Sequence, residues 1–164
     1  MALPAGSALA SIEASPLAVA LRDSHWIHAS VATVHLMGVA LLFGSIAVLD
    51  LRLLGLGRSL SVRRLSAHVL PWTVLGFVLI VPSGLAMFLA HASDLIGSTL
   101  FVAKMALIFA AGCNAALFHA VVAGGMAAWD GDAPPPWGAR SAGGISIALW
   151  LATIACGAFL AELI

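Results

Sequence analysis

The sequence predicts an all-α integral membrane protein, a four-helix up-down-up-down bundle with a short N-terminal interfacial helix. The 164 residues are 62% hydrophobic and 9% charged, and the mean hydropathy is +1.11. A soluble domain of this size does not need so much apolar surface. Several apolar runs are each long enough for one membrane crossing of about 20 residues, and short links join them. We divide the chain into an N-terminal segment, 1–25, and a transmembrane domain, 26–164.

The numbers of basic and acidic residues indicate which kinds of molecule the protein binds. Seven basic residues oppose seven acidic ones, which argues against binding to nucleic acid. The two cysteines, Cys113 and Cys156, each lie inside an apolar run, where a single cysteine usually acts as a small hydrophobic residue. The lipid bilayer is therefore the partner that composition predicts.

The N-terminal segment is predicted to hold one surface helix. Residues 1–11 mix small, polar and apolar types, and we expect them to be loosely ordered. Ser15 and Pro16 then match an N-cap followed by proline at the first helical position. The helix from Pro16 to Ser24 is too short to span and is expected to lie on the membrane surface. No basic residue precedes Arg22, so we expect no cleaved signal peptide.

The first crossing is predicted at about Trp26–Leu54. No Asp, Glu, Lys or Arg occurs from Trp26 to Leu49. Basic residues gather at its far end, where four of the seven occur: Arg52, Arg58, Arg63 and Arg64. The positive-inside rule places this end in the cytoplasm and both termini outside, in a pattern that fits a bacterial inner membrane.

The other crossings are predicted at about Val62–His91, Thr99–Trp129 and Gly143–Leu163. Ala92–Ser98 is expected to form a short outer turn. The stretch 129–137 contains three consecutive prolines and is expected to be a stiff, non-helical connector. Alternating directions of the crossings give the up-down-up-down bundle.

Tryptophan and small residues support these assignments. Trp26, Trp129 and Trp137 lie at predicted membrane interfaces, where tryptophan is enriched. Small residues allow helix backbones to approach closely in lipid, and we expect the following to have that role: Gly38, Gly44, Gly76, Gly84, Gly112, Ala115, Ala116, Gly143, Gly144 and Gly157.

Ionisable side chains within these apolar runs are the candidate functional residues, because they are costly in hydrocarbon. The chain has six histidines. A rise of about 1.5 Å per residue places His35 roughly 13 Å inside the outer face and His119 roughly 15 Å inside the inner face. The histidines therefore form two layers, an outer one of His25, His28, His35 and His91 and an inner one of His68 and His119.

Paired histidines in each leaflet are what a di-haem b-type cytochrome needs, since neutral imidazole is a common axial ligand. Our leading hypothesis is one or two haem b groups, with electron transfer and a quinone or a redox protein as partner. His68 and His119 are expected to ligate the iron of an inner haem. His35 or His28, with His91, is expected to ligate an outer one.

Other interpretations use the same residues. His25, His28 and His91 also suit ordinary wet interfacial positions, and His68 suits an interface near Arg63. An ideal helix places His68 and His91 about 140° apart, so they would face different neighbours.

The outer histidines with Met37 and Met87 suit copper handling or small-solute transport, and the chain also suits a structural accessory subunit of a larger membrane complex. No nucleophile has a base at a recognisable spacing, and whether the protein is an enzyme stays open.

Three further polar residues lie in the apolar runs: Asp50, Lys104 and Asn114. Lys104 and Asp50 suit a proton path. Alternatively, Lys104 extends to the outer surface, and Asp50 pairs locally with Arg52 or Arg58, which we favour for Asp50 because of its interfacial position.

A resemblance supports the architecture. It is carried by the run Ser15–Ser24, by His35-Leu-Met-Gly38, Gly44-Ser45 and Asp50–Gly55, and by Lys104, Asn114 and Phe118-His119. Over about residues 12–125 the chain resembles an uncharacterised family, a domain of unknown function, of small four-pass bacterial inner-membrane proteins. The likeness implies the fold and supplies no activity. On topology and histidine placement alone, the chain is also similar to copper-resistance D-type domains and small b-type cytochromes, but the spacing of His68 and His91 carries over no ligand pair.

Overall fold

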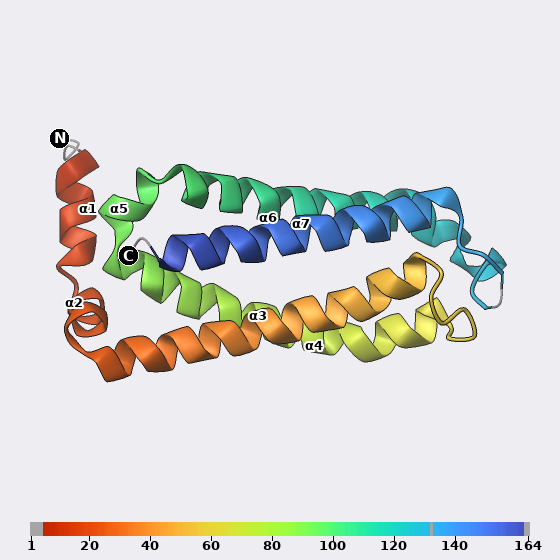
Figure 1. Ribbon diagram of the computed structural model, residues 1–164, viewed down its shortest axis with the longest axis horizontal. Coiled ribbons are helices and arrows are strands. Elements are labelled where there is room, and N and C mark those ends of the chain that lie inside the picture. Colours follow the sequence, from red (N-terminus) through yellow and green to blue (C-terminus); the bar gives the residue numbers. More distant parts are fainter. Residues whose placement is uncertain (1–4, 132, 163–164) are drawn as a thin grey trace.

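The computed structural model describes residues 5–131 and 133–162, and every regular element in these ranges is helical (Figure 1). Long helices run side by side, and short helices cover one end. In chain order the elements are α1 (Ala5–Glu13), α2 (Pro16–Asp23), α3 (His25–Leu53), α4 (Val62–Ala90), α5 (Ala92–Ile96), α6 (Thr99–Leu117), the π-helical η1 (Phe118–Val122), the 3₁₀-helical η2 (Ala123–Ala128) and α7 (Trp137–Ala161).

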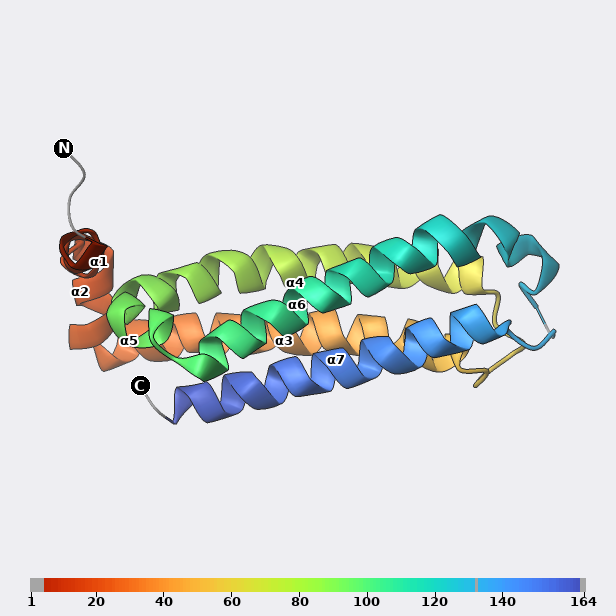
Figure 2. The same ribbon diagram turned by 90° about the horizontal axis from the view of Figure 1, so that it is seen from above.

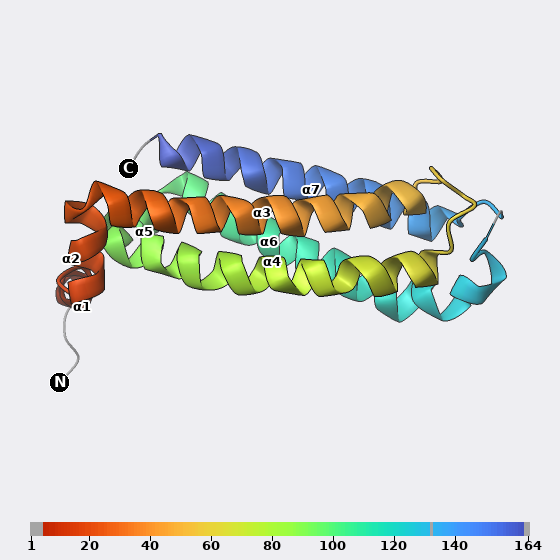
Figure 3. The ribbon, with the colours of Figure 1, turned by 90° about the horizontal axis from the view of Figure 1, so that it is seen from below.

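The long helices form two antiparallel hairpins. α3 packs along α4, α6 packs along α7, and contacts between α3 and α7 join the hairpins. Figures 2 and 3 show this order from above and below. Among the described residues, α4 and α6 make few close contacts with each other. The predicted up-down-up-down bundle is confirmed. Side chains bridge α4 and α6, since the Phe88 and Phe101 rings stack with centroids 5.4 Å apart.

The outer surface of the bundle is apolar. The spans His25–Leu53, Val62–Ala90, Thr99–Val122 and Trp137–Ala161 are long and apolar enough to cross a membrane, with mean hydropathies of 1.9 to 2.2. Large side chains such as Leu36 (67% exposed) and Phe109 (75% exposed) face outward. Exposure of so much apolar surface is unfavourable in water, whereas contact of that surface with lipid tails is favourable. The four membrane helices that the sequence predicts are therefore present.

Serine caps begin three of the helices, and the sequence predicts one of these caps, Ser15. Ser15 accepts a hydrogen bond from the Ala18 amide, with Pro16 at the first helical position of α2. Ser24 caps α3, and Ser61 caps α4. These bonds satisfy amides that have no partner within the helix, so each helix begins within one residue of the predicted position.

The N-terminal segment is more ordered than predicted. The expectation of loose order is wrong for residues 5–11, which belong to α1, whereas residues 1–4 lie outside the described residues. Glu13 accepts a hydrogen bond from the Ser93 amide at 2.7 Å, and Arg22 donates to the Glu13 carbonyl at 2.6 Å. α1 is thereby held against α5, which occupies part of the predicted outer turn. We call this end, formed by α1, α2 and α5, the capped end (Figure 1).

The opposite end differs from the prediction at two helix boundaries. The third membrane helix, predicted to reach Trp129, is α-helical only to Leu117 and continues as η1 and η2. Gly124 and Gly125 in η2 have low helix propensity, which favours this change. The fourth helix begins at Trp137 and not at Gly143, with Pro136 as its N-cap residue. Its predicted last residue, Leu163, lies outside the described residues.

Two of the three tryptophans predicted to lie at the membrane interfaces are exposed. Trp26 and Trp137 are each 82% exposed. Trp129 is only 7% exposed, because it packs in a small hydrophobic core with Leu53 and Val62. This core lies at the end that carries Arg52, Arg58, Arg63 and Arg64, which we call the arginine end.

The small residues divide into packed and open positions. A Cβ atom at Gly76 would lie 2.7 Å from the Leu42 Cβ, and one at Gly143 would lie 2.9 Å from the Asp50 carbonyl oxygen. Gly38 is similarly close to α4. Gly44 and Gly112 have nothing within 4 Å among the described atoms. The packing role predicted for small residues therefore fails at those two positions.

Candidate functional site

The interior of the bundle near the capped end contains a polar site to which all four long helices contribute. His35 comes from α3, Ser83 and Gly84 from α4, Lys104 from α6 and Gly157 from α7. We call these five residues the central site. Each helix supplies either a polar side chain or a glycine, so the site depends on assembly of the whole bundle.

The Ser83 hydroxyl determines which nitrogen of His35 carries the proton. His35 Nδ1 lies 3.0 Å from Ser83 Oγ. Ser83 uses its own proton to donate to the Leu79 and Ile80 carbonyl oxygens, so its oxygen accepts from His35. His35 is therefore the Nδ1–H tautomer. The Ile80 backbone also interacts with the His35 ring. In the Nδ1–H tautomer, Nε2 keeps a lone pair that is available to a ligand.

Two glycines make room for the two ionisable side chains. A Cβ atom at Gly84 would lie 3.0 Å from His35 Cε1 and 3.4 Å from its Nδ1. A Cβ atom at Gly157 would lie 3.3 Å from Lys104 Nζ. The Lys104 side chain thus packs against α7 rather than extending away from the bundle. Its ammonium group interacts electrostatically with His35 and with Cys156.

A second group of histidines lies at the capped end, apart from the central site. His25, His28 and His91 line an open pocket of ≈ 410 Å³ with Leu21, Arg22 and Asp23. The structure therefore brings His28 and His91 to one pocket, as one version of the predicted outer pair requires. His35 does not line it and bonds to Ser83 instead.

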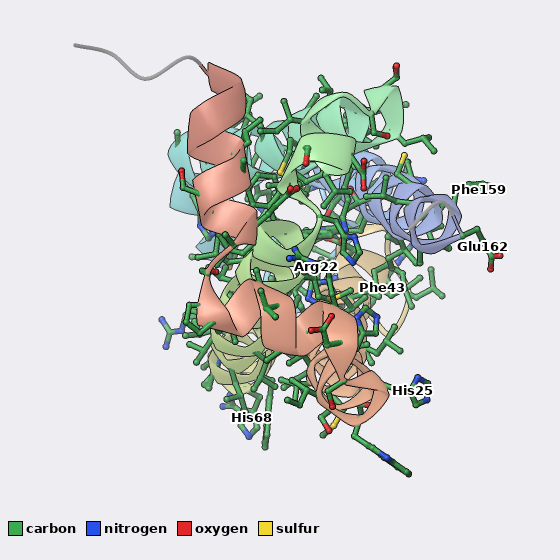
Figure 4. The ribbon with its side chains drawn as sticks, turned by 90° about the vertical axis from the view of Figure 1, so that its left-hand side faces the viewer. Arg22, His25, Phe43, His68, Phe159 and Glu162 are labelled. Carbon is green, nitrogen blue, oxygen red and sulfur yellow. The ribbon has the colours of Figure 1, made fainter. Side chains whose placement is uncertain are left out.

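The two histidines of the predicted inner pair are both exposed. His68 Nδ1 donates to the Arg64 carbonyl of its own helix at 3.1 Å, and Figure 4 shows His68 at the periphery of the bundle. His119 lies in η1, with its ring against Phe118 at a centroid distance of 5.5 Å. The structure brings these two side chains into no hydrogen bond or ring contact with each other within the described residues.

The described parts of the chain hold no group of three or more His, Cys, Asp or Glu side chains arranged to bind a metal ion. The copper hypothesis therefore has no preformed site among these residues. Met37 is 61% exposed on the surface of α3. Cys113 and Cys156 are free thiols, in agreement with their predicted role as small apolar residues.

Asp50 lies near the arginine end of α3 and is 5% exposed. The predicted pairing with Arg52 or Arg58 is wrong. Arg52 donates instead to the carbonyl oxygens of Leu60 at 2.6 Å and Gly131 at 2.9 Å, because residues two apart on a helix point in nearly opposite directions. The Asp50 carboxyl group interacts electrostatically with Ser146 of α7.

Asn114 is engaged between helices. Its Nδ2 donates to the Ala142 carbonyl of α7 at 3.0 Å. A side-chain amide that joins two membrane helices stabilises their packing, so Asn114 acts as a structural residue that joins α6 to α7.

Sequence reasoning missed Ser83, Ser146 and Asp130. Asp130 accepts hydrogen bonds from Ser61 Oγ at 2.9 Å and the Val62 amide at 2.5 Å, and so caps α4 from a distant loop. The signal available for Ser83 was its place after Pro82, as a polar residue in an apolar run. Nothing in the sequence indicated which helix Ser146 would face.

No family model, curated protein or solved structure matches this chain. The family resemblance described above therefore stays a prediction, and the function is argued from the geometry of the site.

Proposed function

We propose that the chain is a b-type haem membrane protein that transfers electrons, and that His35 of the central site is an axial ligand of its haem. The observation that carries the proposal is the orientation of His35. Ser83 holds the proton on Nδ1, and Nε2 keeps its lone pair. Imidazoles that bind metals are usually oriented in this way, by a hydrogen bond from the other ring nitrogen.

The surroundings of His35 also suit a haem. Gly84 and Gly157 keep side-chain volume small beside His35 and Lys104. The backbones of α4 and α6 make few close contacts among the described residues, with the Phe88 and Phe101 rings stacked between them. Four-helix bundles hold cofactors between facing helices. The Lys104 ammonium group supplies a positive charge for a haem propionate, since buried charges require a partner. A quinone remains the proposed redox partner.

A reduced-minus-oxidised visible spectrum tests the proposal, recorded on the full chain purified in mild detergent with metal analysis of the same sample. We expect sharp α and Soret bands together with iron. His35→Gln should lose most of the haem, because the ligand is removed while an amide remains to bond Ser83. His25→Gln is the matched control, since His25 is exposed and should not alter the spectrum. A colourless wild-type protein, or equal haem in the His35 variant, would contradict the proposal.

The inner haem is a separate proposal that rests on the depth of His68 and His119. It predicts a second haem per chain, which His119→Gln would remove. If haem content does not change in that variant, the inner site is excluded and the His35 site is unaffected.

Metal handling or small-solute transport at the capped end is the second candidate function. One observation favours it, namely that His25, His28 and His91 line the same open pocket with Asp23. Imidazole and carboxylate groups bind divalent transition metals. The same metal analysis decides between the candidates, since copper without a Soret band favours this one.

A further inference from the structure

Asp50 is a buried carboxyl group that the proposed haem function does not use. It lies within the candidate membrane span His25–Leu53 and is 5% exposed. At this point α3 and α7 are in close contact, because Gly143 of α7 lies directly against the Asp50 backbone. The carboxyl group is therefore enclosed between two membrane helices.

The carboxyl group has one partner. Ser146 of α7 interacts electrostatically with it, while Asp50 Oδ2 is buried and has no hydrogen-bond partner among the described residues. An ionised carboxylate has two oxygens that require donors or a cation. The site supplies donors for only part of that need.

The cationic groups at this end do not neutralise Asp50. No charged side chain of α3, α4, α6 or α7 within the described ranges interacts with its carboxyl group. Arg52 donates from Nε and Nη2 to the carbonyl oxygens of Leu60, Arg58 and Gly131, and its Nη1 is buried with no hydrogen-bond partner among the described residues. Asp130, which is half-buried at this end, accepts from Ser61 and Val62. The other described groups that titrate or carry charge at this end are exposed, namely Arg58, Arg63, Arg64, His68, His119 and Arg140.

From this geometry we infer that Asp50 and Ser146 form an intramembrane proton-binding site. A carboxylate buried without a cation is costly, and taking up a proton from water at the arginine end removes the charge. The neutral acid donates its O–H to Ser146 Oγ, and Oδ2 becomes a carbonyl oxygen, which is much less costly to leave unpaired than a carboxylate oxygen. A metal ion does not fit here, since Asp50 belongs to no group of three or more described His, Cys, Asp or Glu side chains arranged to bind one.

Infrared difference spectroscopy of the full chain in lipid vesicles, titrated with acid and base, tests the inference. We expect the carbonyl stretch of a protonated carboxylic acid to persist well above about pH 3.9, where exposed aspartates ionise. Asp50→Asn should abolish this band. Asn has nearly the same shape and still accepts from Ser146, so the fold is expected to be retained, as circular dichroism will verify.

Two further variants make the result specific. Asp94→Asn changes a carboxyl group that is exposed on α5 and should leave the band intact. Ser146→Ala should move the band without removing it, because it deletes the hydrogen bond but not the acid. The inference is wrong if the wild-type protein shows no such band, or if the band survives Asp50→Asn. Haem content does not enter this measurement, so its outcome is independent of the proposed function.

Discussion

At the scale of single residues, the few polar side chains of this protein form hydrogen bonds to backbone groups, which apolar side chains cannot do. Arg52 is 1% exposed and donates to three carbonyl oxygens in two loops. Asp130 accepts from the first amides of α4. These hydrogen bonds connect the loop after α3 to the segment before α7. The arginine end is therefore stabilised by two charged side chains that bond to backbone groups.

Asp130 provides a residue-scale prediction about acid stability. Desolvation acts to raise the pKa of Asp130, but hydrogen bonds from Ser61, Val62 and Arg63 and the charge of Arg52 hold it below the ordinary 3.8. A lowered folded-state pKa stabilises the fold above the unfolded pKa, and this contribution is lost as the pH falls through the folded value. Asp130→Ala should lower the free energy of unfolding by about 1 kcal/mol at neutral pH, as loss of a helix cap does.

Chemical unfolding in detergent, followed by circular dichroism between neutral and acid pH, measures this effect. The difference between wild type and Asp130→Ala should shrink as the pH falls. Asp94→Ala, at an exposed carboxylate on α5, is the control and should show no comparable loss at neutral pH. A difference that stays constant down to the lowest pH would show that the charge of Asp130 has no stabilising role.

At the scale of elements, the existence of the helices could be predicted from sequence, but not all of their ends or their contacts. Length and hydropathy are local properties, and they predicted all four spans. The end of α6 at Leu117 and the beginning of α7 at Trp137 were predicted wrongly, because apolar periodicity continues through η1 and Pro136 was not recognised as a cap. The position of His35 within the first span was predictable, whereas its partner Ser83 depends on the register between α3 and α4.

The contact between α3 and α4 provides an element-scale prediction. A Cβ atom at Gly76 would lie 2.8 Å from the Leu42 amide nitrogen and 2.9 Å from its Cα, and a backbone cannot move aside as a side chain does. Gly76→Ala should therefore destabilise the bundle by about 1–3 kcal/mol, the usual cost of overpacking. The measurement is thermal or denaturant unfolding in mild detergent.

Gly112→Ala is the matched control for this packing. Gly112 lies in α6 and has nothing within 4 Å of an added Cβ among the described atoms. The same substitution should leave stability unchanged or raise it slightly, because alanine has the higher helix propensity. If both variants lose equal stability, the close contact at Gly76 is not what makes its substitution costly.

At the scale of the whole molecule, the two ends differ in charge and in how they are closed. α1, α2 and α5 cover the capped end (Figure 1), where Glu13, Arg22 and Ser93 are joined by hydrogen bonds. The arginine end exposes Arg58, Arg63, Arg64 and Arg140. Arg52, which also supports the positive-inside argument, is buried and bonded to loop carbonyls. The asymmetry of free positive charge therefore rests on the other four arginines.

This asymmetry predicts the orientation in the membrane, with the arginine end in the cytoplasm. Single cysteines at exposed positions test it after Cys113→Ala and Cys156→Ala remove the native thiols. A membrane-impermeant thiol reagent applied to intact bacterial cells with a permeable outer membrane should label Asp94→Cys at the capped end. It should label Ser59→Cys, in the loop between α3 and α4, only after the inner membrane is permeabilised. The reverse pattern would place the capped end in the cytoplasm, and labelling of both positions in intact cells would show that free arginines do not determine the orientation of this chain.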